Sequence, residues 1–209
     1  MAQTRRPAFA GRIRNLADAQ LGYFTRAQAA QQGVDDMDLQ RAVRSGAAER
    51  LDHGVYRVSG AGQDPHQRLR ICWLRLSSDL TARERTLHPR LWVSHRSAAA
   101  LLDLGIVTAD IPEFISTRRL QTRAEVRIRV RSAGLPRNVW MVHDGFALTT
   151  PARTIRDLAA DRMDGGHLGR IAFDALSRSL VTAQEVESAL AGRADLQSIL
   201  EQALGGAGG

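Results

Sequence analysis

The 209-residue sequence has no lysine, a single cysteine and few aromatic side chains. One cysteine, Cys72, excludes a disulfide framework and favours a cytoplasmic protein. No apolar run approaches the ~18 residues of a membrane-spanning helix, and the arginine-bearing start has no apolar segment typical of a secretory signal. These absences predict a cytoplasmic protein without a membrane partner.

Patterns typical of enzymes are also missing. None of the six histidines stands at metal-ligand spacing with another histidine or with the cysteine, so no metal site is predicted. No phosphate-binding glycine loop is present. Ser94, His95 and Asp103 supply the residue types of a catalytic triad but lack an elbow motif that poses a nucleophile. The sequence therefore predicts no cofactor and no enzymatic activity.

What the sequence does contain is arginine. All 29 basic residues are arginine, the net charge is +7 and the isoelectric point is about 11.1. The charge is uneven: residues 1–60 carry a net +3, residues 61–150 a net +6 and residues 151–209 a net −2. A strongly basic chain favours a polyanionic partner, and the two basic segments are where such a partner is expected.

The stretch from Tyr23 to Val58 predicts two short helices, a tight turn and a β-ribbon. Thr25 is a good N-cap, and Gly33 is a natural helix end. Asp35 and Asp36 suit the start of a second helix, which runs to Ser45. Two helices joined by a short glycine-containing turn, followed by a hairpin, are typical of a winged helix-turn-helix.

The second helix of this motif has two distinct faces. At 100° per residue, Leu39, Ala42 and Val43 are predicted to bury against the first helix. The opposite side points outward with side chains that reach bases and phosphates in a major groove. These outward residues are Met37, Gln40, Arg41 and Arg44. DNA binding is one interpretation; a winged helix that binds only protein is the other.

The predicted fold is α+β: a winged helix-turn-helix over residues 1–60, then a mixed α/β domain with a helical C-terminal tail over residues 66–204. The turn-rich residues 59–65 are the expected linker. Residues 83–90 are expected to form a loop. Strands are expected at 91–94 and 114–117, a hairpin at 139–148 around Asp144-Gly145, and helices at 66–78, 95–104, 151–159 and from Thr182 and Ala194 onward.

Residues 126–131 alternate valine or isoleucine with arginine, which predicts a half-buried strand. Its polar face would form a second basic surface, either a docking site for nucleic acid or an acidic partner, or an ordinary solvated face. The arginines of this surface are Arg118, Arg119, Arg123, Arg127, Arg129, Arg131 and Arg137.

Three motifs occur in order: a winged helix ending in Gly54-Val55-Tyr56-Arg57, then S-H-R-S-A-A from Ser94, then T-P-A-R-T-I-R-D-L from Thr150. In this series the chain resembles AbiEi-type antitoxins, the regulators of type IV abortive-infection toxin–antitoxin pairs. Some chains with these motifs continue into an endonuclease-like domain. An acid–acid–lysine nuclease motif cannot be complete in a chain without lysine.

The resemblance implies a repressor that binds inverted repeats of double-stranded DNA in its own promoter, as a homodimer or as two monomers meeting on DNA. It also implies that the C-terminal domain counteracts a nucleotidyltransferase-like toxin, by direct contact or by acting on the toxin's target. Carried onto this chain, DNA contact falls on Thr25, Arg26, Gln28, Gln40, Arg41, Arg44 and the wing residues Arg50, His53 and Arg57.

Overall fold

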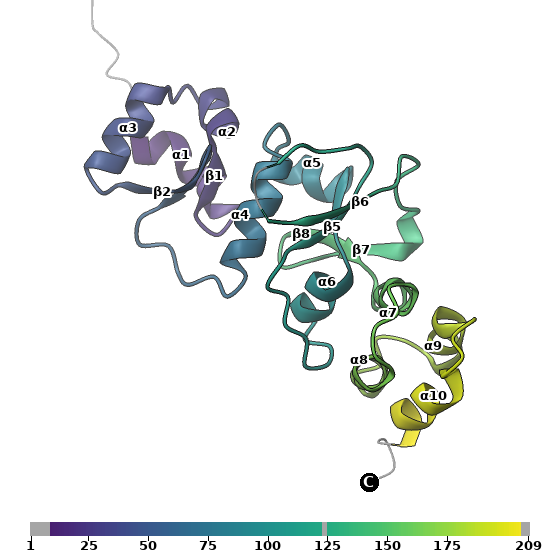
Figure 1. Ribbon diagram of the computed structural model, residues 1–209. Coiled ribbons are helices and arrows are strands. Elements are labelled where there is room, and N and C mark those ends of the chain that lie inside the picture. Colours follow the sequence, from purple (N-terminus) through teal and green to yellow (C-terminus); the bar gives the residue numbers. More distant parts are fainter. Residues whose placement is uncertain (1–8, 123–124, 206–209) are drawn as a thin grey trace, which may run out of the picture. The chain divides into compact units, whose positions relative to one another are not determined.

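The computed structural model describes residues 9–122 and 125–205. The chain divides into two compact units, residues 1–88 and 89–209, and the elements of each are labelled in Figure 1. The first unit is a small sheet with helices in the order of a winged helix, and the second is a mixed sheet with helices. The predicted α+β fold class is confirmed.

The first unit follows the predicted helix-turn-helix and ribbon, and then adds two helices. Its elements are α1 (Phe9–Asp18), β1 (Tyr23–Thr25), α2 (Arg26–Gln31), α3 (Asp36–Arg44), β2 (Ala48–Asp52), β3 (Val55–Val58), α4 (Gln67–Leu76) and α5 (Ala82–Leu87). β3 lies between β1 and β2 and is antiparallel to both. This order of helices and strands is that of a winged helix.

The small sheet of the first unit packs on both faces. Phe24 of β1 and Tyr56 of β3 lie opposite each other and stack with ring centroids 5.6 Å apart, in the core formed with α1, α2 and α3. Because side chains alternate along a strand, Tyr23 and Arg57 point to the other face. There the guanidinium of Arg70, on α4, lies 5.9 Å from the Tyr23 ring centroid. Helix α4 therefore covers the face that α1–α3 leave open.

Residues 66–88 belong to the first unit, whereas the predicted boundary lay at residues 60–66. Arg70 forms a buried ion pair with Asp64 in the expected linker, with Nε and Oδ2 2.7 Å apart. Arg85 of α5 is only 1% exposed and donates to Gln20 and to the Leu80 carbonyl over 3.3 and 2.9 Å. These contacts attach α4 and α5 to the winged helix.

Helix α5 lies in the segment that was predicted to be a loop. Its N-cap Thr81 accepts a hydrogen bond from the backbone N–H of Glu84, and the Glu84 carboxylate accepts from the backbone N–H of Thr81. This reciprocal capping box, with the burial of Arg85, stabilises a short helix that its polar sequence alone does not suggest.

The second unit is built on a five-stranded sheet in the order β6-β5-β4-β8-β7. Its elements are β4 (Leu91–Val93), α6 (His95–Leu101), β5 (Glu113–Ser116), β6 (Arg127–Val130), the 3-10 turn η1 (Arg137–Val139), β7 (Trp140–His143), β8 (Phe146–Thr149), α7 (Pro151–Ala160), α8 (Gly165–Ser177), α9 (Ala183–Leu190) and α10 (Leu196–Gly205). β4 pairs parallel to β8 and β5 pairs parallel to β6, and the other neighbours are antiparallel.

One face of this sheet holds a cluster of Trp92, Ile115 and Ala147 with Trp140 and Leu135. Helix α6 contacts β5 and β8, and α7 packs against α6. The predicted hairpin is present as β7 and β8, where residues 144 and 145 both have positive φ angles of 48° and 75°. Two positive φ angles are the geometry that an Asp-Gly turn favours.

Two helices of the tail, α7 and α9, begin where the sequence predicts, whereas α10 begins at Leu196 rather than at Ala194. Thr150 caps α7 with Pro151 in its first turn, and Thr182 forms a capping box with Glu185 at the start of α9. Helix α10 packs against α8 and α9, with Ile199 1% exposed. Among the residues that the structure describes, no helix is both long and apolar enough to span a membrane.

Candidate nucleic-acid interface

Helix α3 is held in place at its start and along its inner side. Asp35 caps it by accepting a hydrogen bond from the backbone N–H of Asp38 over 2.8 Å. Leu39 and Ala42 are buried in the winged-helix core, as predicted. Val43 was predicted to be buried with them, and this is wrong: it is 37% exposed, because its position on the helix turns it away from the core.

The opposite face of α3 is open to solvent and lies on one continuous stripe. Gln40, Arg41 and Arg44 are exposed, and Met37 is 58% exposed. Spacings of three and four residues place all four side chains on one side of the helix. The structure thus brings together the three predicted DNA-contacting residues of this helix.

Arginines from neighbouring helices neutralise the acidic residues of α3. Arg26, at the start of α2, forms a two-pronged ion pair with Asp36, with one Nε–Oδ1 distance of 2.6 Å. Arg12 of α1 lies 2.7 Å from Asp38, and Arg41 lies 3.2 Å from the same carboxylate. The hydrogen bond from Arg12 holds the pKa of Asp38 below its ordinary value. The carboxylates of α3 are therefore compensated before any phosphate approaches.

Two predicted contacts, Thr25 and Gln28, are structural residues, and assigning them to DNA was wrong. Thr25 is fully buried and caps α2 together with Gln28. Gln28 is 2% exposed and exchanges hydrogen bonds with Gln20 over 3.2 and 3.3 Å. Since neither side chain reaches solvent, neither can contact a duplex.

The wing is a short turn between β2 and β3. Gly54 has a positive φ of 73°, and the register of the two strands shifts between Arg50 and Asp52. Arg50 and His53 are exposed, with Nη2 and Nδ1 3.4 Å apart. These two residues lie where a wing contact was predicted.

Arg57 was predicted as a wing residue, and the structure places it elsewhere. It lies on the inner strand β3, half-buried, with its guanidinium 4.7 Å from the Tyr23 ring centroid and hydrogen-bonded to the Gly62 carbonyl. Its charge is used to hold the sheet to the segment that leads into α4, so it is removed from the candidate interface.

The second basic surface is smaller than its sequence suggests. Strand β6 is at the edge of the sheet, where Val126 and Ile128 are half-buried and Val130 is 55% exposed, so the predicted apolar face is only partly buried. Arg127 lies 3.2 Å from the buried Glu113, and Arg129 pairs with Asp161. The remaining described arginines of this surface, Arg118, Arg119, Arg131 and Arg137, are exposed, while Arg123 lies outside the described residues.

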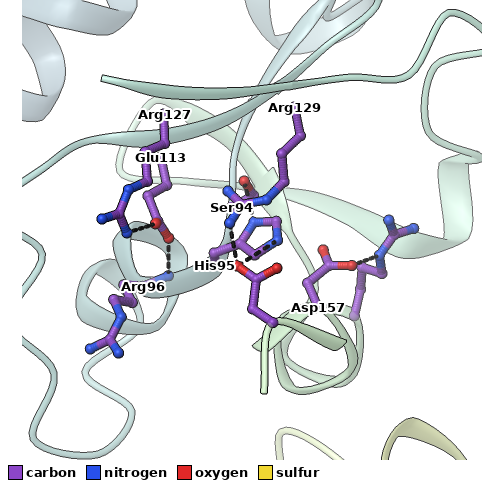
Figure 2. Close-up of polar contacts among 9 residues, drawn as sticks. Ser94, His95, Arg96, Glu113, Arg127, Arg129 and Asp157 are labelled. Atoms are coloured by element: carbon purple, nitrogen blue, oxygen red, sulfur yellow. Dashed lines mark hydrogen bonds and ion pairs between the residues drawn. The ribbon is translucent and has the colours of Figure 1, made fainter. Parts of the chain in front are cut away.

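A polar cluster in the second unit gathers residues from two of the three sequence motifs (Figure 2). His95 Nδ1 lies 2.9 Å from Ser94 Oγ, both side chains are buried, and His95 has a positive φ of 51°. Burial, and next the nearby Arg129 charge, lower the pKa of His95. Figure 2 also shows Arg127 and the backbone of Arg96 meeting at Glu113.

The triad residue types noted in the sequence differ in their exposure. Ser94 is fully buried and offers no accessible nucleophile, and Asp103 is exposed. His95 Nε2 lies 3.9 Å from Asp161 Oδ2, and Asp157 and Glu113 also act on it electrostatically. Asp161 follows the T-P-A-R-T-I motif, and no residue type or spacing in the sequence pairs it with His95. Within the described part of the chain, no group of three or more candidate ligands could hold a metal ion.

A known protein family matches part of the first unit. Residues 12–59 match the family described as "Transcriptional regulator, AbiEi antitoxin". This confirms the resemblance to AbiEi antitoxins over the segment that contains the winged helix. The match runs from residue 12, within α1, to the residue after β3 and includes every candidate DNA-contacting residue.

A solved structure is similar over nearly the whole chain. The crystal structure of RV2827C protein from Mycobacterium tuberculosis superposes with a TM-score of 0.55 at 18% identity, covering 97% of this chain and 79% of that one. At this identity the similarity establishes the fold of both units and nothing of their partners. No curated protein sequence matches the chain.

Proposed function

We propose that this protein is a DNA-binding regulator and antitoxin that represses its own operon through the winged helix. The observation that carries the proposal is the exposed stripe of Gln40, Arg41 and Arg44 on α3, within the segment that matches AbiEi regulators. Helix α3 enters the major groove, and Arg50 and His53 approach the neighbouring backbone. Arg26 lies at the start of α2, exposed and paired with Asp36, and is proposed to contact the DNA backbone from there.

The proposed operator is an inverted repeat in the promoter. Two copies of α3 have to lie about one DNA turn apart, roughly 34–36 Å, to read both half-sites. We therefore expect two chains on each operator, either as a homodimer or as two monomers that meet on DNA.

The second unit is proposed to counteract a nucleotidyltransferase-like toxin, directly or through the toxin's target. The family match covers only residues 12–59, so this part of the proposal rests on the resemblance of the motifs at Ser94 and Thr150 to AbiEi-type antitoxins. It is separable from DNA binding. It involves no catalysis by this chain, in keeping with the full burial of Ser94. Exposed Arg118, Arg119 and Arg131 make the second basic surface the first place to seek contact with a toxin or with its nucleic-acid target.

A mobility-shift measurement on the DNA upstream of the gene tests operator binding. The wild-type protein should shift this DNA, and log K should fall linearly with log salt as phosphate contacts release counterions. Arg41→Ala/Arg44→Ala should weaken binding by about 2–4 kcal/mol, because Arg44 is expected to read a base and Arg41 a phosphate.

The matched control is Arg119→Ala/Arg131→Ala, which removes the same charge from exposed positions of the second unit. It should leave the shift nearly unchanged. Equal weakening by both double variants would show that net charge rather than α3 drives binding. No shift at any salt concentration would overturn the repressor and favour a winged helix that binds only protein.

Toxin counteraction is tested separately by growth of cells that express the adjacent toxin gene. Wild-type protein and Arg41→Ala/Arg44→Ala should rescue growth equally when both are expressed from an unrelated promoter. Failure of the wild-type protein to rescue would remove the antitoxin part and leave the regulator.

A further inference from the structure

The outward stripe of α3 includes one apolar residue, which lies near the middle of the width of the stripe. Met37 is 58% exposed and is not part of the winged-helix core. At 100° per residue it lies between Gln40 and Arg44 on one side and Arg41 on the other. This large apolar side chain therefore lies on the polar outer face of α3 and does not pack in the core of its own unit.

Met37 also lies in the first turn of α3, at the end of the helix that approaches the bases. In helix-turn-helix proteins the N-terminal residues of the recognition helix contact base edges. Among the acids around Met37, Asp36 is paired with Arg26, Asp38 is paired with Arg12, and Asp35 accepts a hydrogen bond as the N-cap. The first turn therefore presents Met37 in an electrostatically compensated setting.

The floor of the major groove offers one apolar group, the C5-methyl of thymine. We propose that Met37 reads a thymine methyl, so that each operator half-site carries a thymine beneath the first turn of α3. This inference rests on the proposed DNA-binding function. The flexible thioether suits the task because methionine adapts to an irregular apolar surface.

The neighbouring polar residues of the stripe can contact further bases of the same half-site. Gln40 lies one turn further along the stripe, where its amide can pair with adenine, and Arg44 lies a further turn on, where its guanidinium can pair with guanine. The predicted half-site thus runs from a thymine under Met37 toward a guanine under Arg44. No other exposed apolar side chain of α3 lies on this stripe, since Val43 is turned roughly 120° from Met37.

The test starts by selecting binding sites from a random duplex library with the wild-type protein. Each thymine of the selected half-site is then replaced by deoxyuridine, which removes only the methyl group. At one position the wild-type affinity should fall about four-fold, the value of one buried methyl group. Met37→Ala should bind the thymine duplex several-fold more weakly and should not distinguish thymine from deoxyuridine there.

Val43→Ala is the matched control on the same helix and should retain the full four-fold discrimination. Loss of discrimination in Met37→Ala alone supports the inference. A wild-type protein that binds thymine and deoxyuridine duplexes equally, or a Met37→Ala variant that still discriminates, overturns it while leaving DNA binding intact. A selection that yields no preferred sequence overturns the proposed function itself, and this inference with it.

Discussion

His95 is a buried histidine of the second unit whose ionisation is linked to folding. It is buried against Ser94, and burial lowers its pKa below the ordinary value of about 6.5. The unfolded chain therefore binds a proton that the folded chain does not. The neutral His95 therefore does not reduce the free energy of unfolding at a pH above its pKa in the unfolded chain. As the pH falls through 6.5 toward the pKa of His95 in the folded chain, the free energy of unfolding declines.

We expect His95→Asn to reduce the decline in unfolding free energy between pH 7 and pH 5. Asparagine tolerates the positive φ of this position better than most residues. Urea titrations at several pH values measure the effect, and the exposed His143→Asn is the control. An unchanged slope in His95→Asn would show that His95 is not the group that titrates.

Two ion pairs with the same helical spacing differ because their elements differ in burial. On α7, Arg153 and Asp157 lie 2.7 Å apart with side chains only 8% and 12% exposed. On α8, Arg170 and Asp174 lie 3.1 Å apart with Arg170 56% exposed. The pair on α7 is largely buried because this helix packs against both α6 and α9.

Arg153→Ala should therefore destabilise the protein by about 3–5 kcal/mol, since it leaves the Asp157 carboxylate buried without its partner. Arg170→Ala, with the same i to i+4 spacing, should cost about 0.3–0.5 kcal/mol. Thermal and urea unfolding of the two variants compare them directly. Similar losses in both would mean that spacing rather than burial sets the strength of the pair.

Elements with local signals were predictable from the sequence, and elements fixed by distant contacts were not. Thr150-Pro151, Asp144-Gly145 and Thr182 each specify a cap or turn within a few residues, and each is found where expected. Helix α5 was missed because its burial depends on Arg85 reaching Gln20, 65 positions away. Strand β6 was correctly predicted as a strand, but its place at the sheet edge depends on pairing order, which alternation does not encode.

The residues of the candidate interface also fall into two groups, those predictable from the local sequence and those fixed by distant contacts. Gln40, Arg41 and Arg44 follow from the periodicity of α3 and are exposed as predicted. Gln28 also lies on a predicted helix, but its burial depends on hydrogen bonds to Gln20 and to the Leu80 carbonyl. A polar side chain used in a buried network cannot be distinguished in sequence from one that faces a ligand.

At the scale of the whole molecule, the boundary after His88 defines which piece of the chain can fold alone. A fragment of residues 1–88 should unfold cooperatively, because it retains the buried Arg70–Asp64 pair and the bond between Arg85 and Gln20. A fragment of residues 1–60 exposes Tyr23 and loses the hydrogen bonds of Gln20 to Arg85 and of Gln28 to the Leu80 carbonyl. It should be less stable by at least about 1–3 kcal/mol, given about 0.5–1.5 kcal/mol for each of these two hydrogen bonds.

Circular dichroism melts of the two fragments measure the difference. Equal melting temperatures would mean that α4 and α5 add nothing to the winged helix and that the boundary lies nearer residue 60. A cooperative transition in the longer fragment alone would support the 88-residue unit.

The brevity of the wing has a consequence for how much information one chain can extract from DNA. In the proposed complex only His53 and Gly54 lie at the tip of the wing. Arg41 is expected to contact a phosphate, so almost all sequence discrimination falls to Met37, Gln40 and Arg44 of α3. Three side chains specify only a handful of base pairs, while a genome offers about 10⁶–10⁹ competing sites. A single chain would bind many sites that match its short recognition sequence by chance. Binding to one site in the genome therefore requires that two chains recognise two half-sites together.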